Sequence, residues 1–539
     1  MSIATALRAP KGSWFLFDVV ITDGTIIDGT GSPRYRADVG VRADRVVEIG
    51  DLKDAESKLA VDASGKIVAP GFIDVHNHSD GWMLKSPHMT SKTLQGFTTE
   101  VLMLDGLGYA PVDEQTARQW LFYLRALDGL RMDEYRGWRR IDEFMQSLEG
   151  RNVQNAATHV PYANVRSLAC GFGKTVVDDF QMRSIQAEIR TGMEQGAVGL
   201  STGLDYIVQC HATTRELIEA CSVVAEFDGL YATHVRYKLG RMRAVREAVE
   251  IARASGVRLH ISHFKGEDER AAEELLEYID KEARHEVELT FDVYPYQPGS
   301  TMLSYLLPYD AWEDGPLGVF SRLHDPRIRA RFRDGLNAYR LELDKLTIAW
   351  VGTRENKHLQ GRLLSDYVEE RGVPAEEAIF DLLAEERLAV LLVFNEGDDR
   401  VVWPMLQHDL CMMGTDGIHC DEGQVHPRQF GSAGRWLGSC VRDLKLFSLE
   451  EAVYKMSGFA AKTFGLKDRG VLSAGSFADV VVFDAETVED RATYADPQQH
   501  SVGVEHVLVN GEPIVREGAA LEAGREDLPG RFVRMERAS

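Results

Sequence analysis

The stretch Gly71-Phe-Ile-Asp-Val-His-Asn-His-Ser-Asp80 places two histidines, His76 and His78, two positions apart at the end of an apolar run. In a β strand, side chains at positions i and i+2 point to the same face, so both imidazoles can converge on one point. The residues Ile67-Val-Ala-Pro-Gly-Phe-Ile-Asp-Val predict a buried strand, and the histidines lie where it ends. A His-x-His pair can occur by chance in a surface loop, but this context indicates a metal site.

The middle of the chain repeats the same pattern of an apolar run followed by a polar residue. Amphipathic segments, including 214–227, 240–255 and 267–284, separate these runs. Repeated β-then-α units in one direction imply a parallel sheet, and this many units predict an α/β fold of the (β/α)8 TIM barrel type. From about residue 302 to 340 the alternation of strands and helices is interrupted by a helical stretch with Pro and Arg. We expect this stretch to be an inserted lid.

Both ends of the chain have a different sequence pattern. Short apolar runs alternate there with Gly and Asp turns, which is typical of small antiparallel strands. We therefore expect one discontinuous β-sandwich domain, formed by residues 1–69 and 471–539, around a metal-dependent barrel of residues 70–470. A chain of 539 residues is long enough for both units.

Composition excludes several classes of partner. The formal net charge is −23, with 84 acidic and 61 basic residues, and no dense Lys/Arg block offers a binding surface for nucleic acid or anionic membrane. No apolar run approaches the ~20 residues that span a bilayer. The first residues lack an apolar signal core, so we expect a cytoplasmic protein. The six cysteines show no C-x-x-C pairing, which predicts free thiols in a reducing compartment.

Further polar residues follow the other predicted strands, at the end where a barrel carries its catalytic residues. Alone, each has an ordinary explanation, because a single histidine is often a core residue and an Asp before Gly often forms a turn. Together they provide enough ligands for one or two divalent ions. His260 faces the other side of its strand from the residue chosen there. The candidates are His76, His78, Asp105, His234, His263 and Asp416.

Several motifs together resemble the D-aminoacylase (N-acyl-D-amino-acid deacylase) family of the amidohydrolase superfamily over nearly the whole chain. The resemblance implies a β-sandwich with a metal-binding (β/α)8 barrel that hydrolyses the amide of an N-acyl-D-amino acid. Beside the opening stretch, the motifs are Gly199-Leu-Ser-Thr-Gly-Leu-Asp-Tyr, Tyr231-Ala-Thr-His-Val-Arg, Ile261-Ser-His-Phe-Lys, Asp292-Val-Tyr-Pro-Tyr, Gly414-Thr-Asp-Gly and His426-Pro-Arg.

The resemblance also implies roles for single residues. His76 and His78 would hold a first metal position, and His234 and His263 a second. Asp416 would be a ligand of the first position and the proton shuttle between the attacking water and the leaving nitrogen. The residues expected to contact the polar groups of a small, anionic amide substrate are Lys265, Tyr296 and Arg428.

The chain departs from the family at residues near the expected pocket. Asp105 stands where the family has a metal-bridging cysteine, and because a carboxylate is harder than a thiolate, Mn or Fe becomes possible beside Zn²⁺. Pro161-Tyr162, Val208-Gln209 and Tyr237-Lys238 also differ from the family.

These departures keep two other functions open. One is hydrolysis of another C–N bond, in a cyclic amide, an isopeptide-like dipeptide or a xenobiotic amide. The other is a metal-free, non-catalytic relative, against which the four retained histidines and Asp416 argue. Barrels of this kind often pair, so a homo-oligomer is also possible.

Overall fold

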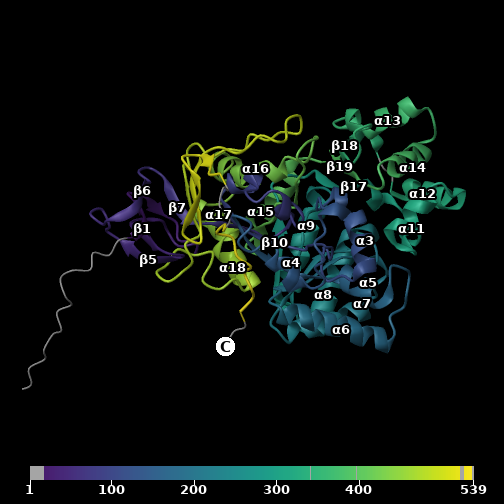
Figure 1. Ribbon diagram of the computed structural model, residues 1–539, viewed down its shortest axis with the longest axis horizontal. Coiled ribbons are helices and arrows are strands. Elements are labelled where there is room, and N and C mark those ends of the chain that lie inside the picture. The colour runs from purple at the N-terminus through teal and green to yellow at the C-terminus, as the bar shows by residue number, and fades with distance from the viewer. Residues whose placement is uncertain (1–16, 340–341, 396, 523–526, 537–539) are drawn as a thin grey trace, which may run out of the picture.

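A computed structural model describes the chain except for residues 1–16, 340–341, 396, 523–526 and 537–539. The protein has a mixed α/β fold that is elongated in Figure 1, with small strands at one end and a group of helices at the other. No helix in the described part of the chain is long and apolar enough to cross a membrane. The N-terminal residues behind the prediction of a cytoplasmic location lie outside the described residues.

Two β sheets at one end combine the two termini of the chain (Figure 1). One sheet has the order β5 (Arg45–Gly50), β4 (Asp38–Arg42), β1 (Phe17–Thr22) and β6 (Ser57–Asp62). The other sheet has the order β25 (Ala519–Ala520), β24 (Glu512–Arg516), β23 (Val504–Val509), β22 (Val480–Phe483), β7 (Ile67–Pro70), β2 (Thr25–Ile26) and β3 (Tyr35–Arg36).

The C-terminal strands are part of the same core as the N-terminal strands. Strand β22 pairs antiparallel with β7, with Val482 opposite Val68. Val480 and Val482 pack with Ile21 and Val41 in one buried apolar cluster. Because alternate residues of each strand face this cluster, neither end of the chain could bury its apolar face without the other.

A series of short parallel strands follows the chain order and positions the candidate site. In one sheet β10 (Phe97–Leu102) lies between β8 (Phe72–Asp74) and β11 (Asn155–Thr158). A second sheet has the order β12 (Val160–Pro161), β13 (Gly199–Gly203), β14 (Leu230–His234), β15 (Arg258–Ile261), β16 (Leu289–Val293) and β20 (Cys411–Met413). A parallel pair of β21 (Gly417–Ile418) with β9 (Asn77–His78) then connects the last of these strands to the first.

Amphipathic helices connect and flank these strands. Capping residues set where these helices begin and end. The hydroxyl of Thr213 accepts the Glu216 backbone N–H at the start of α7, and Gly256, with φ 75°, ends α8. The helices in this part of the chain are α1 (Trp82–Lys85), α2 (Thr90–Thr93), α3 (Glu114–Tyr123), α4 (Ile141–Gln146), α5 (Tyr162–Cys170), α6 (Asp179–Glu194), α7 (Thr214–Ala225), α8 (Arg241–Ser255), α9 (Glu269–Tyr278), α10 (Arg284–Glu286), α15 (Trp403–Gln407), α16 (Arg428–Arg435), α17 (Leu449–Met456) and α18 (Gly458–Phe464).

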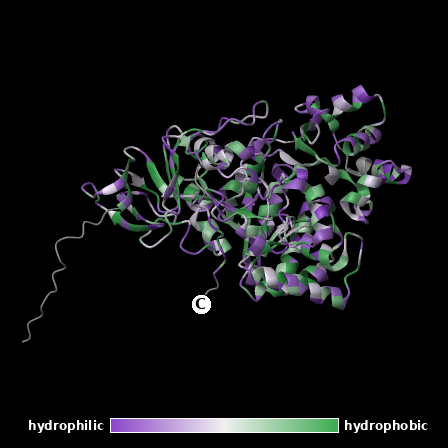
Figure 2. Cartoon of the chain, viewed as in Figure 1, coloured by the Kyte–Doolittle hydropathy of each residue, from purple (hydrophilic) through white to green (hydrophobic). Residues whose placement is uncertain are grey.

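The β-then-α order is interrupted between β16 and α15. An antiparallel sheet of β17 (Gly299–Met302), β19 (Val390–Phe394) and β18 (Leu346–Val351) occurs there. It carries the helices α11 (Gly315–Arg322), α12 (Pro326–Tyr339), α13 (Leu364–Arg371) and α14 (Ala375–Glu385), which lie together at the upper right of Figure 1. We call residues 299–394 the insertion; the stretch predicted as a lid lies inside it. Figure 2 shows hydrophilic residues along these outer helices and hydrophobic residues on the strands.

A buried ion pair fastens the C-terminal segment to the rest of the fold. Arg469 donates to the Asp479 carboxylate, and the two side chains are 3% and 4% exposed. The same carboxylate accepts the backbone N–H of Asn510 at 2.8 Å and the side-chain amide of Asn155, on β11, at 3.2 Å. One carboxylate therefore connects the C-terminal strands to a parallel strand.

We predict that Asp479→Ala destabilises the protein by about 3–5 kcal/mol, because it leaves the Arg469 guanidinium buried without its counter-charge. Thermal unfolding followed by circular dichroism should show a lower midpoint. Glu536→Gln removes the partner of Lys467 in an exposed pair and serves as the control, with the midpoint expected to stay at the wild-type value. Equal midpoints for both variants would contradict the role of Asp479.

Candidate metal centre

The structure brings all six predicted metal ligands to one place. Five of them form two overlapping groups, and within each group the ligand atoms lie within 4.8 Å of one another; Asp105 belongs to both groups. Asp416 joins the first group, with its Oδ1 atom 3.3 Å from Nε2 of His78. The two groups are His76, His78 and Asp105, and Asp105, His234 and His263.

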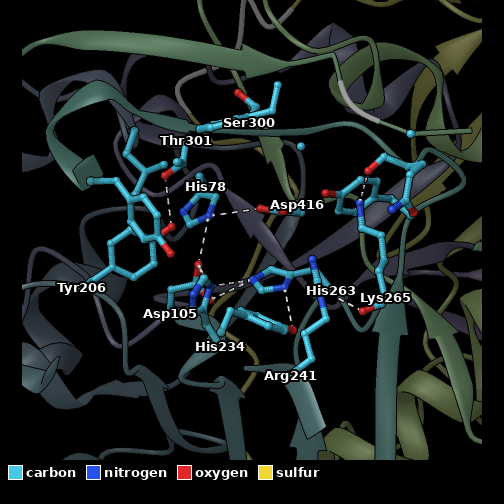
Figure 3. A pocket seen from close by; sticks show the side chains of 18 of the residues that line it. His78, Asp105, Tyr206, His234, Arg241, His263, Lys265, Ser300, Thr301 and Asp416 are labelled. Atoms are coloured by element: carbon cyan, nitrogen blue, oxygen red, sulfur yellow. Dashed lines mark hydrogen bonds and ion pairs between the residues drawn. The ribbon is translucent and has the colours of Figure 1, made fainter. Parts of the chain in front are cut away.

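Asp105 lies between the two histidine pairs (Figure 3). Its Oδ1 atom is 3.6 Å from Nε2 of His76 and 3.8 Å from Nε2 of His263. Its Oδ2 atom is 3.8 Å from Nε2 of His78 and 3.9 Å from Nδ1 of His234. Each carboxylate oxygen thus faces both pairs, which is the arrangement that a bridging ligand requires.

The backbone turns sharply at three of these residues. Asp105, His263 and Asp416 have φ angles of 55°, 37° and 48°. These values lie in the left-handed region, which residues other than glycine seldom adopt. Such a conformation costs of order 1–3 kcal/mol and tends to occur at functional sites. Each of these residues lies two or three residues after the end of a strand, and the turn there directs its side chain toward the shared centre.

A buried carboxylate on β16, Asp292, orients the histidines from behind. It contacts Nδ1 of His76 at 3.2 Å and Nε2 of His260 at 3.0 Å, and accepts the backbone N–H of His263 at 2.9 Å. Because Nδ1 of His76 faces this carboxylate, its Nε2 atom is left directed at the centre. His260 is therefore a partner of Asp292 and is not in either group of ligands.

Two further carboxylates contact the outer nitrogens of two other histidines, one from each pair. Asp128 lies 3.3 Å from Nδ1 of His78, and Asp205 lies 3.4 Å from Nε2 of His234. A carboxylate behind a histidine fixes its tautomer and makes its free nitrogen a better metal ligand. This support is typical of metal centres.

The residues fit a divalent cation. Among the described residues, Nε2 of His76 and Oδ1 of Asp105 are buried and have no hydrogen-bond partner, although such buried polar atoms are nearly always paired. A cation between them would satisfy both atoms. Imidazole and carboxylate ligands suit zinc as well as manganese and iron.

Strong electric fields act inside the centre. Burial lowers the pKa of His76 and His78, but the neighbouring carboxylates outweigh it and raise the pKa values to about 9 and about 10. Burial raises the pKa of Asp416, but Arg428 and the imidazoles hold it well below its usual range. Asp416 is therefore ionised at neutral pH and favours positive charge at the centre.

A cavity of about 310 Å³ opens onto this centre. Figure 3 shows Ser300 and Thr301, from the insertion, on the opposite side of the cavity from His263. Two basic side chains, Arg241 and Lys265, also line it. The cavity thus combines the metal ligands with two basic side chains.

The predicted substrate-binding residues have different surroundings. Lys265 lines the cavity, where its Nζ donates to the carbonyl oxygens of Tyr296 and Gln297 at 3.0 and 3.1 Å. Burial and nearby Arg428 lower the pKa of Lys265 well below its usual value. The Tyr296 hydroxyl donates to Asp490 instead, at 3.4 Å, and Tyr296 is not among the residues that line the cavity.

Arg428 contacts the predicted proton shuttle. Its Nη1 atom lies 2.8 Å from Oδ2 of Asp416, and its Nη2 donates to the carbonyl oxygen of Ser300 at 3.2 Å. The guanidinium is fully buried and stacks 4.4 Å from the Tyr294 ring centroid. Arg428 is not among the residues that line the cavity. Arg428 therefore forms an ion pair with Asp416 and lowers its pKa.

Sequence reasoning did not assign the carboxylates behind the histidines or Arg241 in the cavity. One of them left a signal: Asp292 is a charged residue inside an otherwise apolar strand, where an ionised group needs a partner. Asp205 lies inside the motif Gly199-Leu-Ser-Thr-Gly-Leu-Asp-Tyr, but the motif alone gave it no role, and Asp128 lies in a turn without such a pattern.

Comparison with known proteins identifies the family. The sequence model of the amidohydrolase family matches residues 59–316 and 397–515. The chain belongs to the amidohydrolase family. It is 35% identical to the D-aminoacylase of Alcaligenes xylosoxydans xylosoxydans over 509 residues, covering 93% of this chain and 95% of the relative.

Solved structures agree with this assignment. The structure of N-acyl-D-glutamate deacylase from Bordetella bronchiseptica, complexed with zinc and a phosphonate mimic of the tetrahedral intermediate, is 33% identical with a TM-score of 0.81. The match covers 96% of this chain and 99% of the deacylase chain. A structure of D-aminoacylase from work on its binuclear metal centre is 31% identical, with a TM-score of 0.80 and coverage of 96% and 100%. The predicted family resemblance is confirmed.

The pKa values of His76 and His78 predict that metal affinity increases with pH. In the metal-free protein both values lie above the ordinary 6.5, so protonation stabilises the fold fully below about pH 6.5 and this contribution is lost as the pH rises through about 9 to 10. A metal ion must displace these protons. Titration calorimetry with Zn²⁺ at pH 6 and pH 8, in buffers of different ionisation enthalpy, should show tighter binding at pH 8 and proton release. Affinity independent of pH would contradict this prediction.

Proposed function

We propose that the protein is a metal-dependent hydrolase that removes the acyl group of an N-acyl-D-amino acid. The observation that carries this proposal is the Asp105 carboxylate between two histidine pairs, beside a cavity lined by Lys265 and Arg241. The relatives named D-aminoacylase and N-acyl-D-glutamate deacylase support the reaction and the substrate class.

We propose that the parallel strands form a (β/α)8 barrel of about residues 70–470, interrupted by the insertion. The chain-order pairing from β8 to β20, and the pair of β21 with β9, support a closed barrel. The two terminal sheets would form a β-sandwich domain of residues 1–69 and 471–539, supported by their shared apolar cluster.

The proposed cofactor is Zn²⁺, as one or two ions, with Mn or Fe as alternatives because Asp105 replaces the cysteine of the family. His76, His78 and Asp416 would hold one ion, His234 and His263 the other, and Asp105 would bridge them. A divalent ion bound there supplies Lewis-acid activation of water and of the acyl carbonyl.

Asp416 is proposed to move the proton. Its low pKa keeps it ionised, so it can accept a proton from the attacking water and donate it to the leaving nitrogen. Arg428 holds Oδ2 of Asp416 and leaves Oδ1 directed toward His78 and the centre. A substrate carboxylate that attracted Arg428 would weaken this contact and make Asp416 a stronger base.

Lys265 and Arg241 are proposed to bind the substrate's anionic group at the cavity wall, since an ion pair is strongest where water is excluded. Tyr296 stays a predicted contact of the carbonyl or of polar groups. We expect the substrate to be a small anionic amide. The proposed location is the cytoplasm, and the proposed assembly is a homo-oligomer.

The protein should contain tightly bound divalent metal and should hydrolyse N-acetyl-D-amino acids faster than their L-enantiomers. Elemental analysis and a panel of D- and L-substrates, together with cyclic amides and dipeptides, would measure this. Turnover of another amide without D-selectivity would support the alternative C–N hydrolase. Absence of both bound metal and metal-rescued activity would contradict an enzyme of either kind.

Asp416→Asn should lower kcat by at least ~100-fold, because the amide cannot accept the proton. Metal content should be measured in parallel, since Asp416 is also a proposed ligand. Asp421→Asn, in the same loop region with a side chain that is 75% exposed, is the matched control and should keep wild-type kcat. Near-normal turnover by the Asp416→Asn variant would remove the residue from this role.

A further inference from the structure

Asp205 lies in the turn after β13 and is 3% exposed. Its Oδ2 atom faces Nε2 of His234 at 3.4 Å and accepts the backbone N–H of Lys238 at 3.2 Å. The carboxylate therefore connects a proposed metal ligand to the loop that follows β14. The proton transfer proposed above does not involve it.

The insertion supplies the other partners of this carboxylate. The hydroxyl of Tyr309 donates to Oδ1 of Asp205 at 2.9 Å, and the hydroxyl of Tyr305 donates to Oδ2 at 3.3 Å. Both tyrosines lie in the short helical turns Leu303–Leu306 and Tyr309–Trp312, directly after β17. Two separate groups of the insertion thus contact one buried anion.

Two more contacts hold the same region of the insertion in place. The ammonium of Lys238 donates to the carbonyl oxygen of Tyr305 at 3.0 Å and lies 3.9 Å from its ring centroid. The hydroxyls of Tyr206 and Thr301 are 3.1 Å apart, and the Tyr206 ring lies 5.0 Å from that of His234. The start of the insertion is therefore packed around His234.

The hydrogen bond from His234 to Asp205 decides which nitrogen is available for metal. When Nε2 carries the proton toward Asp205, Nδ1 keeps its lone pair and faces Nε2 of His263, 3.0 Å away. Buried hydrogen bonds to a charged group are among the stronger ones, so a fully bonded Asp205 is well fixed.

We propose that Asp205 is a positioning residue for His234, and that the insertion sets its position through the hydroxyls of Tyr305 and Tyr309. The inference rests on the proposed metal site. It implies that the second metal position, formed by Asp105, His234 and His263, gains affinity from the insertion. Tyr305 and Thr301 also line the cavity, so the same segment shapes the substrate site and completes the metal site.

The test measures zinc affinity of the full chain after chelator treatment, by titration with Zn²⁺ against a chromophoric competitor. His234→Ala identifies which class of zinc sites depends on His234. Asp205→Asn should weaken that class by about 10- to 100-fold, the range found for partners of metal-bound histidines, and leave the other class unchanged. The double variant Tyr305→Phe and Tyr309→Phe, which keeps Asp205, should weaken the same class by about 10-fold, at the low end of this range.

Tyr367→Phe is the matched control, because Tyr367 lies in the insertion and its hydroxyl donates to the carbonyl oxygen of Ala378, at 3.3 Å, rather than to Asp205. It should bind zinc as the wild type does. Wild-type zinc affinity in the double tyrosine variant would overturn the proposal, including where Asp205→Asn fails to fold. Wild-type protein that binds zinc but hydrolyses no N-acyl-D-amino acid would contradict the proposed function alone.

Discussion

The Asp105 carboxylate between two pairs of imidazoles is the constraint on which the site depends. Both of its oxygens face histidines from different strands at 3.6–3.9 Å, and one of them has no hydrogen-bond partner among the described residues. An ionised carboxylate in such a place is costly unless a positive charge shares it. The parallel strands bring the histidines close enough to provide that charge, as imidazolium or as a metal complex.

Around this anion the structure adds a second set of carboxylates. Asp292, Asp128 and Asp205 contact the outer nitrogens of His76, His78 and His234. Repulsion between these carboxylates is offset because each of them contacts at least one imidazole. A bound cation would lower that repulsion further, which links metal binding to the stability of the fold.

Part of this organisation could be predicted from the sequence. Apolar runs followed by His or Asp indicated the parallel strands and their polar ends, because strand period and burial are local properties. The family resemblance is confirmed, and the predicted ligands lie together. The boundaries of the insertion were harder to predict: β18 and β19 lie far from β17 along the chain, and their antiparallel pairing has no local signature.

The sequence by itself determined the class of chemistry, because imidazoles and carboxylates at strand ends are written directly in residue types and spacing. Only the tertiary structure decided what each of these groups contacts. Arg428 reaches Asp416, Tyr296 turns to Asp490, and Asp205 joins His234 to the insertion. These pairings depend on how loops from distant segments fold over the strand ends, and the free energy of a buried charge depends on every neighbour that surrounds it.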